Sequence, residues 1–423
     1  MLQVKYILEN KKDVIEGLQK RNLDAKTLVQ KIIDLDIERR ASISKVEELR
    51  AEGNKMSKAI GGLFKEGKIE EGNTVKVKVQ ETKTEQRNLE ENLKKIEEKF
   101  QDLLYQIPNV PHITVPAGSS EDDNEEVFKE GDIPNLHKGA KPHWEIVKDK
   151  DIVDFETGVK ITGAGFPVYK GKGARLQRAL INFFLDEAEK AGYAEVIPPL
   201  LINEKSGIGT GQLPDKEGQM YHVTGDDLYL IPTAEVPVTN IYRDVILNKE
   251  ELPKKNCGYT PCFRREAGSY GKDVRGLNRL HQFDKVEIVQ VVHPSESYDV
   301  LNEMVEHVKE LVRKLKLPFR ILRLCGGDLG LTSALTFDFE VYSTAQKRWL
   351  EVSSVSNFET YQSNRLKLRF RKGQEKPQLA HTLNGSALAL PRILAALIEN
   401  NQNKNGDIEI PKILQKYTGF DII

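Results

Sequence analysis

Residues 262–287 read Cys-Phe-Arg-Arg-Glu-Ala-Gly-Ser-Tyr-Gly-Lys-Asp-Val-Arg-Gly-Leu-Asn-Arg-Leu-His-Gln-Phe-Asp-Lys-Val-Glu. A β-like run stands at each end of this stretch, and a glycine-rich basic loop joins the two runs. Because side chains at positions i and i+2 of a strand share a face, we expect Arg264 beside Glu266. The same rule places three side chains on one face of the second strand: Phe283, Lys285 and Glu287. The stretch therefore predicts a hairpin with one functional face.

The side chains of this face suit a nucleotide and an amino acid together. A guanidinium grips phosphate oxygens as a fork, and a carboxylate can hold an ammonium group. An aromatic ring offers a stacking surface for a base. The combination indicates ATP plus an amino acid. The alternative is a solvated hairpin held by ion pairs.

The composition limits the classes of protein that fit. The chain has 423 residues, 30% of them charged, and a net charge of −1, so it is long enough for two or three domains and a large core. Nucleic-acid binding must come from local basic patches, because no overall positive charge drives it. The three cysteines lack Cys-x-x-Cys spacing, which favours a reducing compartment and argues against a structural zinc site. The N-terminus lacks the apolar stretch of a signal peptide, and no apolar run approaches the ~18 residues of a membrane span, so we expect a cytoplasmic protein.

The N-terminal part predicts a long helical hairpin after a short helical lead-in over residues 1–27. A heptad-like apolar seam runs from Leu28 to Leu63, and a second runs from Val75 to Leu103. Two seams of similar length predict an antiparallel coiled coil, and at about 1.5 Å per residue each arm would reach roughly 50–60 Å. The helix break between the seams is expected at Gly61, Gly62 and Gly67.

The tip of this hairpin, residues 55–78, carries more lysine than glutamate. The six lysines are Lys55, Lys58, Lys65, Lys68, Lys76 and Lys78. A local excess of positive charge suits a phosphate backbone. The alternative is a structural coiled coil with an ordinary solvated tip.

The rest of the chain predicts an α+β fold. Residues 107–142 are rich in proline and contain an acidic run, which predicts a linker. Beyond it, consecutive strands with short connections predict an antiparallel sheet flanked by helices. The expected elements are a helix over 174–191, strands at 258–266, 281–292, 335–343 and 348–355, a strand with a basic face at 365–371, and a final helix from Pro391.

Several motifs together carry a family resemblance. A helix and strand ending in Pro199 fit motif 1 of the class II aminoacyl-tRNA synthetases, and Arg264-x-Glu266 with its continuation to Glu287 fits motif 2 in a serine-type form. The remaining matches are motif 3 from Asn384 to Arg392, and the segments Thr210-Gly211-Gln212-Leu213-Pro214, Thr233-Ala234-Glu235 and Glu351-Val352-Ser353-Ser354. Over essentially its whole length the chain resembles seryl-tRNA synthetase of the bacterial type. Two small departures, Val355 in place of a common cysteine and the Gly326-Gly327-Asp328 segment, touch no motif position.

The resemblance implies a ligase that works in two steps. The carboxylate of L-serine attacks the α-phosphorus of ATP to give seryl-adenylate and pyrophosphate, and the 3′-terminal ribose of tRNA(Ser) then takes the seryl group and releases AMP. Neither step needs a covalent enzyme nucleophile, so positioning and charge stabilisation carry the catalysis. The family also implies Mg²⁺, tRNA(Sec) as a further substrate, and a homodimer that binds tRNA across subunits. It implies a tRNA-binding domain with its coiled-coil arm at 1–106, a linker at 107–142 and a class II catalytic domain at 143–423.

The family pattern also implies roles for the matching residues. Arg264 and Arg392 are the implied catalytic residues: Arg264 would bridge the α-phosphate and the serine carboxylate, and Arg392 would meet the γ-phosphate. Phe283 would stack on the adenine, with Arg392 opposite, and Glu266 would lie near the adenine amino group or hold Arg264. The implied Mg²⁺ ligands are Glu351 and Ser354, and the other implied ATP contacts are Arg265, Arg279, Leu280, Val352 and Ser353. The implied serine contacts are Thr233, Ala234, Glu235, Arg264, Glu287, Asn384 and Ser386.

Some questions stay open at this point. Lys285 could contact phosphate or form a structural ion pair, and the basic face at 365–371 could meet the acceptor stem or solvent. A non-catalytic paralog that binds RNA or protein through the arm is one rival, which the intact motif residues disfavour. A class II synthetase for threonine or proline is another, which the Thr233-Ala234-Glu235 segment and the arm disfavour.

Overall fold

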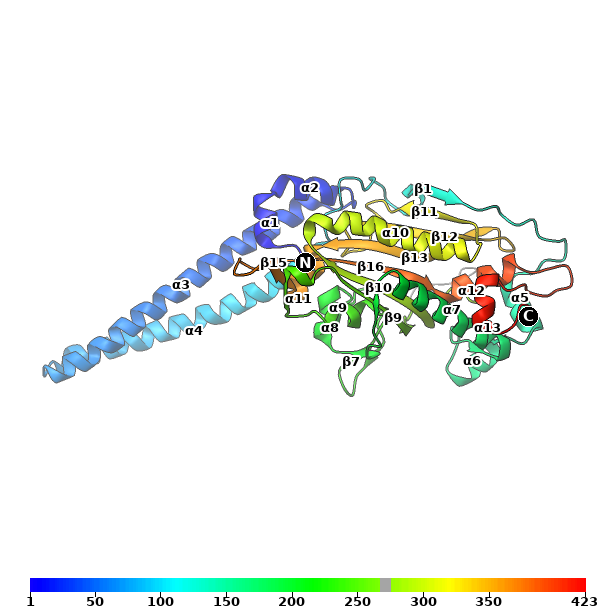
Figure 1. Cartoon of the computed structure of the whole chain (residues 1–423). Helices are drawn as coiled ribbons and strands as arrows, with labels where there is room; N and C mark the ends of the chain where they lie inside the picture. The colour runs from blue at the N-terminus through cyan, green and yellow to red at the C-terminus, as the bar shows by residue number, and fades with distance from the viewer. Residues whose placement is uncertain (267–274) are drawn as a thin grey trace. The chain divides into compact units, whose positions relative to one another are not determined.

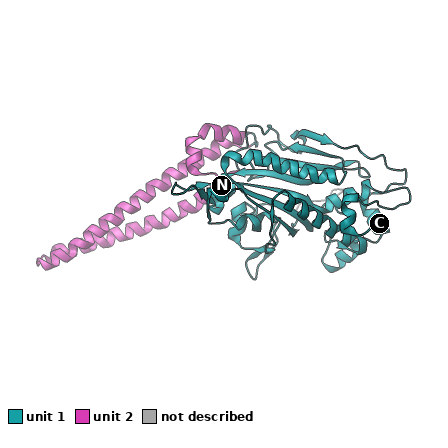
Figure 2. Ribbon diagram, in the orientation of Figure 1, with its two compact units in different colours: residues 1, 20–22, 109–423 teal, residues 2–19, 23–108 magenta. Residues whose placement is uncertain are grey.

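The computed structural model describes residues 1–266 and 275–423, and it divides into two compact units. One unit comprises residues 2–19 and 23–108, and the other comprises residues 1, 20–22 and 109–423 (Figure 2). We call the first the arm unit and the second, which contains the segment expected from the sequence to be catalytic, the catalytic unit.

The arm unit consists of four helices. They are α1 (Val4–Glu9), α2 (Lys11–Gln19), α3 (Ala25–Lys65) and α4 (Ile69–Gln106) (Figure 1). The long helices α3 and α4 run antiparallel and pack through apolar side chains such as Ile32 and Leu49 on α3 and Phe100 on α4. Asp24 caps the start of α3 by accepting a hydrogen bond from the Thr27 amide at 3.2 Å. The predicted helical hairpin is confirmed.

The turn at the tip differs from the prediction. Gly61 and Gly62 lie inside α3, and the chain turns at Glu66 to Lys68, where Gly67 has a φ of +76°. A glycine inside an exposed helix costs only about 1 kcal/mol relative to alanine, so a helix of 41 residues can continue through Gly61 and Gly62. The left-handed conformation at Gly67 is the one that favours glycine at this turn.

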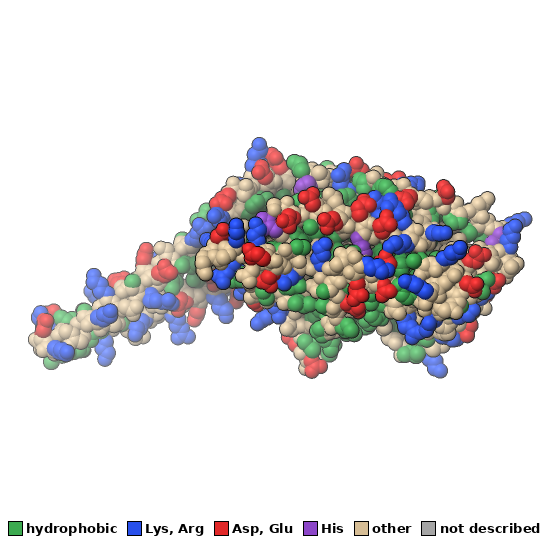
Figure 3. Space-filling model, in the orientation of Figure 1, with side chains coloured by type: hydrophobic (Ala, Val, Ile, Leu, Met, Phe, Trp, Pro, Cys, Tyr) green, Lys and Arg blue, Asp and Glu red, His purple; other side chains and the backbone are tan. Residues whose placement is uncertain are grey.

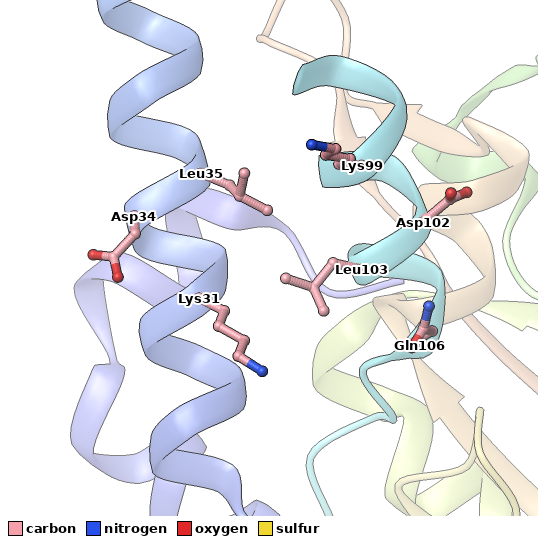
Figure 4. A pocket seen from close by; sticks show the side chains of 7 residues that line it. All are labelled: Lys31, Asp34, Leu35, Lys99, Asp102, Leu103 and Gln106. Carbon is pink, nitrogen blue, oxygen red and sulfur yellow. The ribbon is translucent and has the colours of Figure 1, made fainter. Parts of the chain in front are cut away.

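An open cleft of about 440 Å³ lies between the start of α3 and the end of α4 (Figure 4). Its apolar surface comes from Leu35 and Leu103, which belong to the two seams. The other lining side chains are polar or charged and balance in sign: Lys31, Asp34, Lys99, Asp102 and Gln106.

The catalytic unit is built on an eight-stranded sheet with the order β1-β11-β12-β13-β16-β10-β9-β4. All neighbours pair antiparallel except β4 with β9, which confirms the predicted antiparallel α+β core. The strands are β1 (Glu125–Glu130), β4 (Ala194–Glu195), β9 (Lys254–Phe263), β10 (Gln282–Val292), β11 (Phe319–Arg323), β12 (Leu335–Ser343), β13 (Arg348–Glu359) and β16 (His381–Ala389).

The two faces of this sheet differ in polarity. Helices α7 (Gly171–Lys190), α10 (Ser297–Lys314) and α12 (Leu390–Asn400) form the main core with apolar strand residues such as Ile288 and Val355. The opposite face carries polar side chains and is bordered by α9 (Glu235–Asn240) and α11 (Thr360–Leu366). Smaller elements are α5 (His143–Asp149), α6 (Phe155–Ile161), α8 (Glu204–Thr210), α13 (Lys412–Thr418), β2 (Val153–Asp154), β3 (Val168–Tyr169), β5 (Leu201–Ile202), β6 (His222–Val223), β7 (Leu228–Leu230), β8 (Ile246–Asn248), β14 (Arg369–Arg371) and β15 (Gln378–Leu379).

The segment predicted as a linker, residues 107–142, contributes a strand to the sheet. β1 pairs antiparallel with β11 at the sheet edge. Its acidic residues face arginines: Glu126 lies 3.4 Å from Arg320, and Glu130 lies 2.7 Å from Arg313. Opposite charges across neighbouring elements let an acidic, proline-flanked segment join the sheet edge.

Residues 365–371 were predicted as one strand, and that prediction is wrong for the first half. α11 continues to Leu366, Lys367 has a φ of +53°, and only β14 (Arg369–Arg371) is a strand. The predicted alternation of burial is nevertheless present, because Leu366, Leu368 and Phe370 are buried. The helix from Pro391 is also not the last one, since α13 follows it.

Candidate active site

The strand register aligns polar side chains in rows across the sheet. Asp338 on β12 lies opposite Ser354 on β13, and Ser386 on β16 lies opposite Glu287 on β10. Opposed residues share a face of a sheet, so these side chains belong to one polar surface. A second row on the same face contains Thr336, Ser356 and Asn384.

A β-bulge adds a further residue to this surface. Phe339 pairs with Ser353, and the next residue of β12, Glu340, pairs with Glu351, so Val352 is an extra residue in β13. Glu351 and Ser354 therefore share the polar face although they are three residues apart, and the Ser354 hydroxyl lies 3.5 Å from a Glu351 carboxylate oxygen.

The other two residues of this segment face the opposite way. The Val352 side chain is 1% exposed within the main core, and the Ser353 hydroxyl donates to the Ser386 carbonyl at 2.6 Å. Any contact of Val352 or Ser353 with a nucleotide is thus left to the backbone.

A buried charge cluster joins β10 to the segment before α9. Lys285 and Glu287 form an ion pair in which the side chains are 7% and 2% exposed. The Lys285 ammonium also donates to the Thr233 hydroxyl at 2.7 Å, and that hydroxyl donates to Glu287 at 3.1 Å. Burial raises the pKa of Glu287, while Lys285 opposes that shift. Of the two roles left open for Lys285, the structure shows the ion pair.

Glu235, the first residue of α9, extends this cluster. It is 7% exposed, and burial together with the nearby Glu287 charge raises the pKa of Glu235 to about 7. Hydrogen bonds from Gln362 and Asn384 oppose the shift, and the Gln362 Nε2 donates to Glu235 Oε1 at 2.6 Å. Ala234, which precedes Glu235, is fully buried against Val238 and Val289.

The motif 2 residues lie beyond the end of β9 rather than on it. β9 stops at Phe263, and Glu266 has a φ of +48°, so the expected strand face shared by Arg264 and Glu266 is absent. The Arg264 guanidinium lies 5.2 Å from the centre of the Phe283 ring, and its Nε donates to the Pro232 carbonyl at 3.3 Å. Glu266 instead forms an ion pair with Arg279 at 3.2 Å.

Arg392 reaches the polar face from the first turn of α12. Its Nη1 donates to the Glu351 carbonyl at 2.8 Å and lies 3.4 Å from the Glu351 carboxylate. Its Nε donates to the Asn278 carbonyl at 2.8 Å. The structure thus brings Arg392 together with Glu351 and Ser354.

The comparisons with known proteins agree with this geometry. The Seryl-tRNA synthetase N-terminal domain family matches residues 1–111, and the tRNA synthetase class II core domain (G, H, P, S and T) matches residues 220–401. The chain is 49% identical over 421 residues to the serine–tRNA ligase of Salinibacter ruber, which covers 99% of this chain and 98% of that protein. The chain belongs to the seryl-tRNA synthetase family. Its activity is that of a serine–tRNA ligase, an enzyme of the aminoacyl-tRNA synthetase class.

Two more members of this synthetase family support the assignment. The serine–tRNA ligase of Geobacter sulfurreducens is 46% identical over 421 residues, with 99% of each chain covered. The crystal structure of seryl-tRNA synthetase from Pyrococcus horikoshii complexed with ATP has a TM-score of 0.92 and 35% identity, and it covers 100% of this chain and 99% of that one. No helix in residues 1–266 and 275–423 has the length and apolar character needed to cross a membrane.

Some residues that the synthetase resemblance implies lie at the margin of the cluster. The Arg265 guanidinium is 5.8 Å from the centre of the Tyr221 ring, and Leu280 is 4% exposed in the main core. Residues 267–274, most of the predicted glycine-rich loop, lie outside the described residues.

Sequence reasoning missed two polar residues of this synthetase site. Gln362 on α11 holds Glu235, and Asp338 on β12 lies opposite Ser354. Burial and the charge of Glu351 raise the pKa of Asp338 well above its usual value. A signal for Asp338 was present, because Asp338 and Glu340 alternate with two phenylalanines.

Proposed function

We propose that L-serine is activated by ATP on the polar face of the eight-stranded sheet, with its α-ammonium group between Glu235 and Glu287. The supporting observation is a pair of buried carboxylates at one place on this face, with Lys285 acting on both and Arg264 acting on Glu287. Burial, together with the nearby Glu287 charge, raises the pKa of Glu235 to about 7. A bound ammonium group would add a positive charge beside both carboxylates and favour their ionised forms.

The neighbouring polar groups would recognise the rest of the amino acid. Thr233, Asn384 and Ser386 offer hydroxyl and amide groups, and each is less than 9% exposed. A pocket that hydrogen-bonds the serine hydroxyl rejects alanine, because alanine lacks the hydroxyl and would leave buried polar groups of the pocket without a partner. Threonine would have to be excluded by its size.

We propose that Arg264 and Arg392 act on the phosphates. Arg264 would bridge the α-phosphate and the serine carboxylate, neutralising charge as the nucleophile approaches. Phe283 would carry the adenine, with Arg265, Glu266, Arg279 and Leu280 around the nucleotide and the backbone of Val352 and Ser353 at its edge. Arg392, which already contacts Glu351, would reach the γ-phosphate.

The donor atoms on β12 and β13 fit Mg²⁺. Glu351 and Ser354 provide a carboxylate and a hydroxyl, and among the described residues the Asp338 Oδ1 is a buried oxygen without a hydrogen-bond partner. Oxygen ligands of this kind are the ones that a hard cation prefers. When bound, Mg²⁺ would neutralise phosphate charge, and Glu351 and Ser354 would hold it.

We further propose that the arm unit contacts tRNA(Ser). All six tip lysines are exposed: Lys55, Lys58, Lys65, Lys68, Lys76 and Lys78. Duplex RNA is read mainly by shape and phosphate contacts, which an elongated basic tip can supply. Cytoplasmic location, a homodimer that binds tRNA across subunits, and charging of tRNA(Sec) complete the proposal.

The first experiment is amino-acid-dependent exchange between ATP and pyrophosphate with serine, threonine, alanine, cysteine and glycine. Exchange with serine alone is expected, and Arg264→Ala should abolish it. Glu235→Gln and Glu287→Gln should each raise the KM for serine and leave the KM for ATP nearly unchanged. Exchange without serine dependence, or an unchanged KM for serine in both carboxylate variants, would refute the proposed pocket.

A further inference from the structure

The side-chain amide of Gln362 is fully used in hydrogen bonds. Its Nε2 donates to Glu235 Oε1 at 2.6 Å and to the Thr210 carbonyl at 3.2 Å. Its Oε1 accepts a hydrogen bond from the Thr382 hydroxyl at 2.8 Å. Gln362 and Thr382 are each 1% exposed, so these contacts lie away from solvent. Both donors and the acceptor of the amide thus have defined partners.

The acceptor contact determines which end of the amide faces Glu235. If the amide rotated by half a turn, its oxygen would face the Glu235 carboxylate, and its NH₂ group would replace the oxygen that Thr382 contacts. The Thr382 hydroxyl and the Thr210 carbonyl both favour the observed orientation. The NH₂ group is therefore held toward one oxygen of Glu235.

The ionised form of Glu235 needs a hydrogen-bond donor at this position. Glu287 is close enough to disfavour its charge, and Lys285 contacts Glu287 and Thr233 directly. A hydrogen bond from a neutral amide favours the carboxylate without adding a competing cation. Gln362 contacts Oε1, and Asn384 supplies a further hydrogen bond to the same carboxylate.

We propose that Gln362, oriented by Thr382, is a positioning residue that fixes the Glu235 carboxylate for the ammonium group of serine. The inference rests on the proposed function, because it assumes that Glu235 binds that group. It adds two residues on α11 and β16 to the determinants of amino-acid affinity. An amide that merely fills a polar space in the core would support folding without selecting serine.

The test measures serine-dependent ATP–pyrophosphate exchange in Gln362→Met and Thr382→Val. Loss of a hydrogen bond to a charged group is expected to raise the KM for serine by about ten- to a hundredfold in Gln362→Met. Thr382→Val should raise it by about three- to tenfold, because the amide remains but loses its orientation. The KM for ATP should stay within about twofold of wild type, since ATP does not contact Gln362 in this scheme.

Gln290→Met is the matched control. Gln290 is also 1% exposed, and its amide donates to the Tyr193 hydroxyl at 2.8 Å from the apolar side of the sheet. Its loss should lower the thermal midpoint without changing the KM for serine.

A double-mutant cycle with Glu235→Gln separates the possible roles. If Gln362 acts through Glu235, Gln362→Met should add little to the effect of Glu235→Gln. A normal KM for serine in Gln362→Met or Thr382→Val, beside a raised one in Glu235→Gln, would overturn this inference and leave the proposed function standing. An unchanged KM in Glu235→Gln would instead overturn the proposed function. If Gln362→Met raised the KM for serine and the KM for ATP equally, Gln362 would have a purely structural role. If Gln362→Met does not fold, the KM values of Thr382→Val decide the test.

Discussion

Replacing Lys285 with methionine tests the buried ion pair at the centre of the site. The side chains of Lys285 and Glu287 are 7% and 2% exposed, so the substitution leaves a carboxylate inside the protein with the Thr233 hydroxyl as its remaining contact from this cluster. Removing one partner of a buried pair destabilises a protein by about 3–5 kcal/mol. We expect a loss of this size in the free energy of unfolding of the catalytic unit at pH 8.

The loss should shrink at lower pH. Burial already raises the pKa of Glu287, and removal of Lys285 raises it further. A carboxyl group whose folded-state pKa is raised contributes stability below its unfolded pKa, and this contribution is lost as the pH rises through the folded pKa. The variant should therefore be closer to wild type at pH 5 than at pH 8.

Urea unfolding followed by tryptophan fluorescence is the assay. Both tryptophans, Trp144 and Trp349, lie in the catalytic unit, so the signal reports that unit. The control is Lys141→Met, which removes an ion pair with Asp149 at 2.6 Å in which both side chains are about half exposed. Its cost should stay below about 1 kcal/mol. If Lys285→Met and wild type had equal free energies of unfolding at pH 8, the conclusion that the substitution leaves Glu287 buried without its ion-pair partner would be refuted.

Three further predictions follow from other parts of the catalytic unit. The KM for serine should rise as the pH falls below about 7, by up to tenfold per unit, because Glu235 then becomes protonated, and Glu235→Gln should flatten this dependence in exchange assays from pH 5.5 to 8.5. Burial lowers the pKa of His381 to about 4, so its contribution to stability is complete above about pH 6.5 and is lost as the pH falls through about 4. The loss should amount to about 3 kcal/mol, and urea unfolding of His381→Gln should not show it. Gly211→Ala should destabilise by about 1–3 kcal/mol in the same assay, because Gly211 has a φ of +93° and a Cβ there would lie 2.3 Å from Thr332 Cγ2; a wild-type midpoint would contradict that packing.

Elements with strong periodicity were predictable from the sequence. The strand at 335–343 has the predicted bounds, and the helical hairpin follows its two apolar seams. Alternation and heptad spacing depend on near neighbours in the chain, so one sequence suffices to read them.

The strand predicted at 365–371 shows the limit of that reasoning. A helix end, one left-handed residue at Lys367 and a short strand gave the same pattern of buried and exposed residues as a single strand would. Arg365 consequently donates to the carbonyls of Ile208 and Leu213 instead of facing outward with a basic strand.

The side-chain contacts within the site could not be predicted from one sequence. Lys285 meets a hydroxyl 52 residues away, and Gln362 meets a carboxylate 127 residues away. Glu351 shares a face with Ser354 because of the bulge at Val352. Such pairings depend on which strands become neighbours and in what register, and local sequence patterns do not determine either.

The distribution of buried residues along α3 has a consequence for local opening of the arm unit. The buried residues of this helix lie between Ala25 and Gly53, and none of its last twelve residues, from Asn54 to Lys65, is fully buried. Each turn of a two-helix arm contacts only its facing neighbours, so opening can start at the end and progress inward without crossing a large barrier. Amide hydrogen exchange should therefore form a gradient, fastest at Gly67 and slowest near Ile32. The lysine-bearing tip would then sample open states far more often than the helical base, and a bound nucleic acid that closes those states would be detected as slowed exchange at the tip alone.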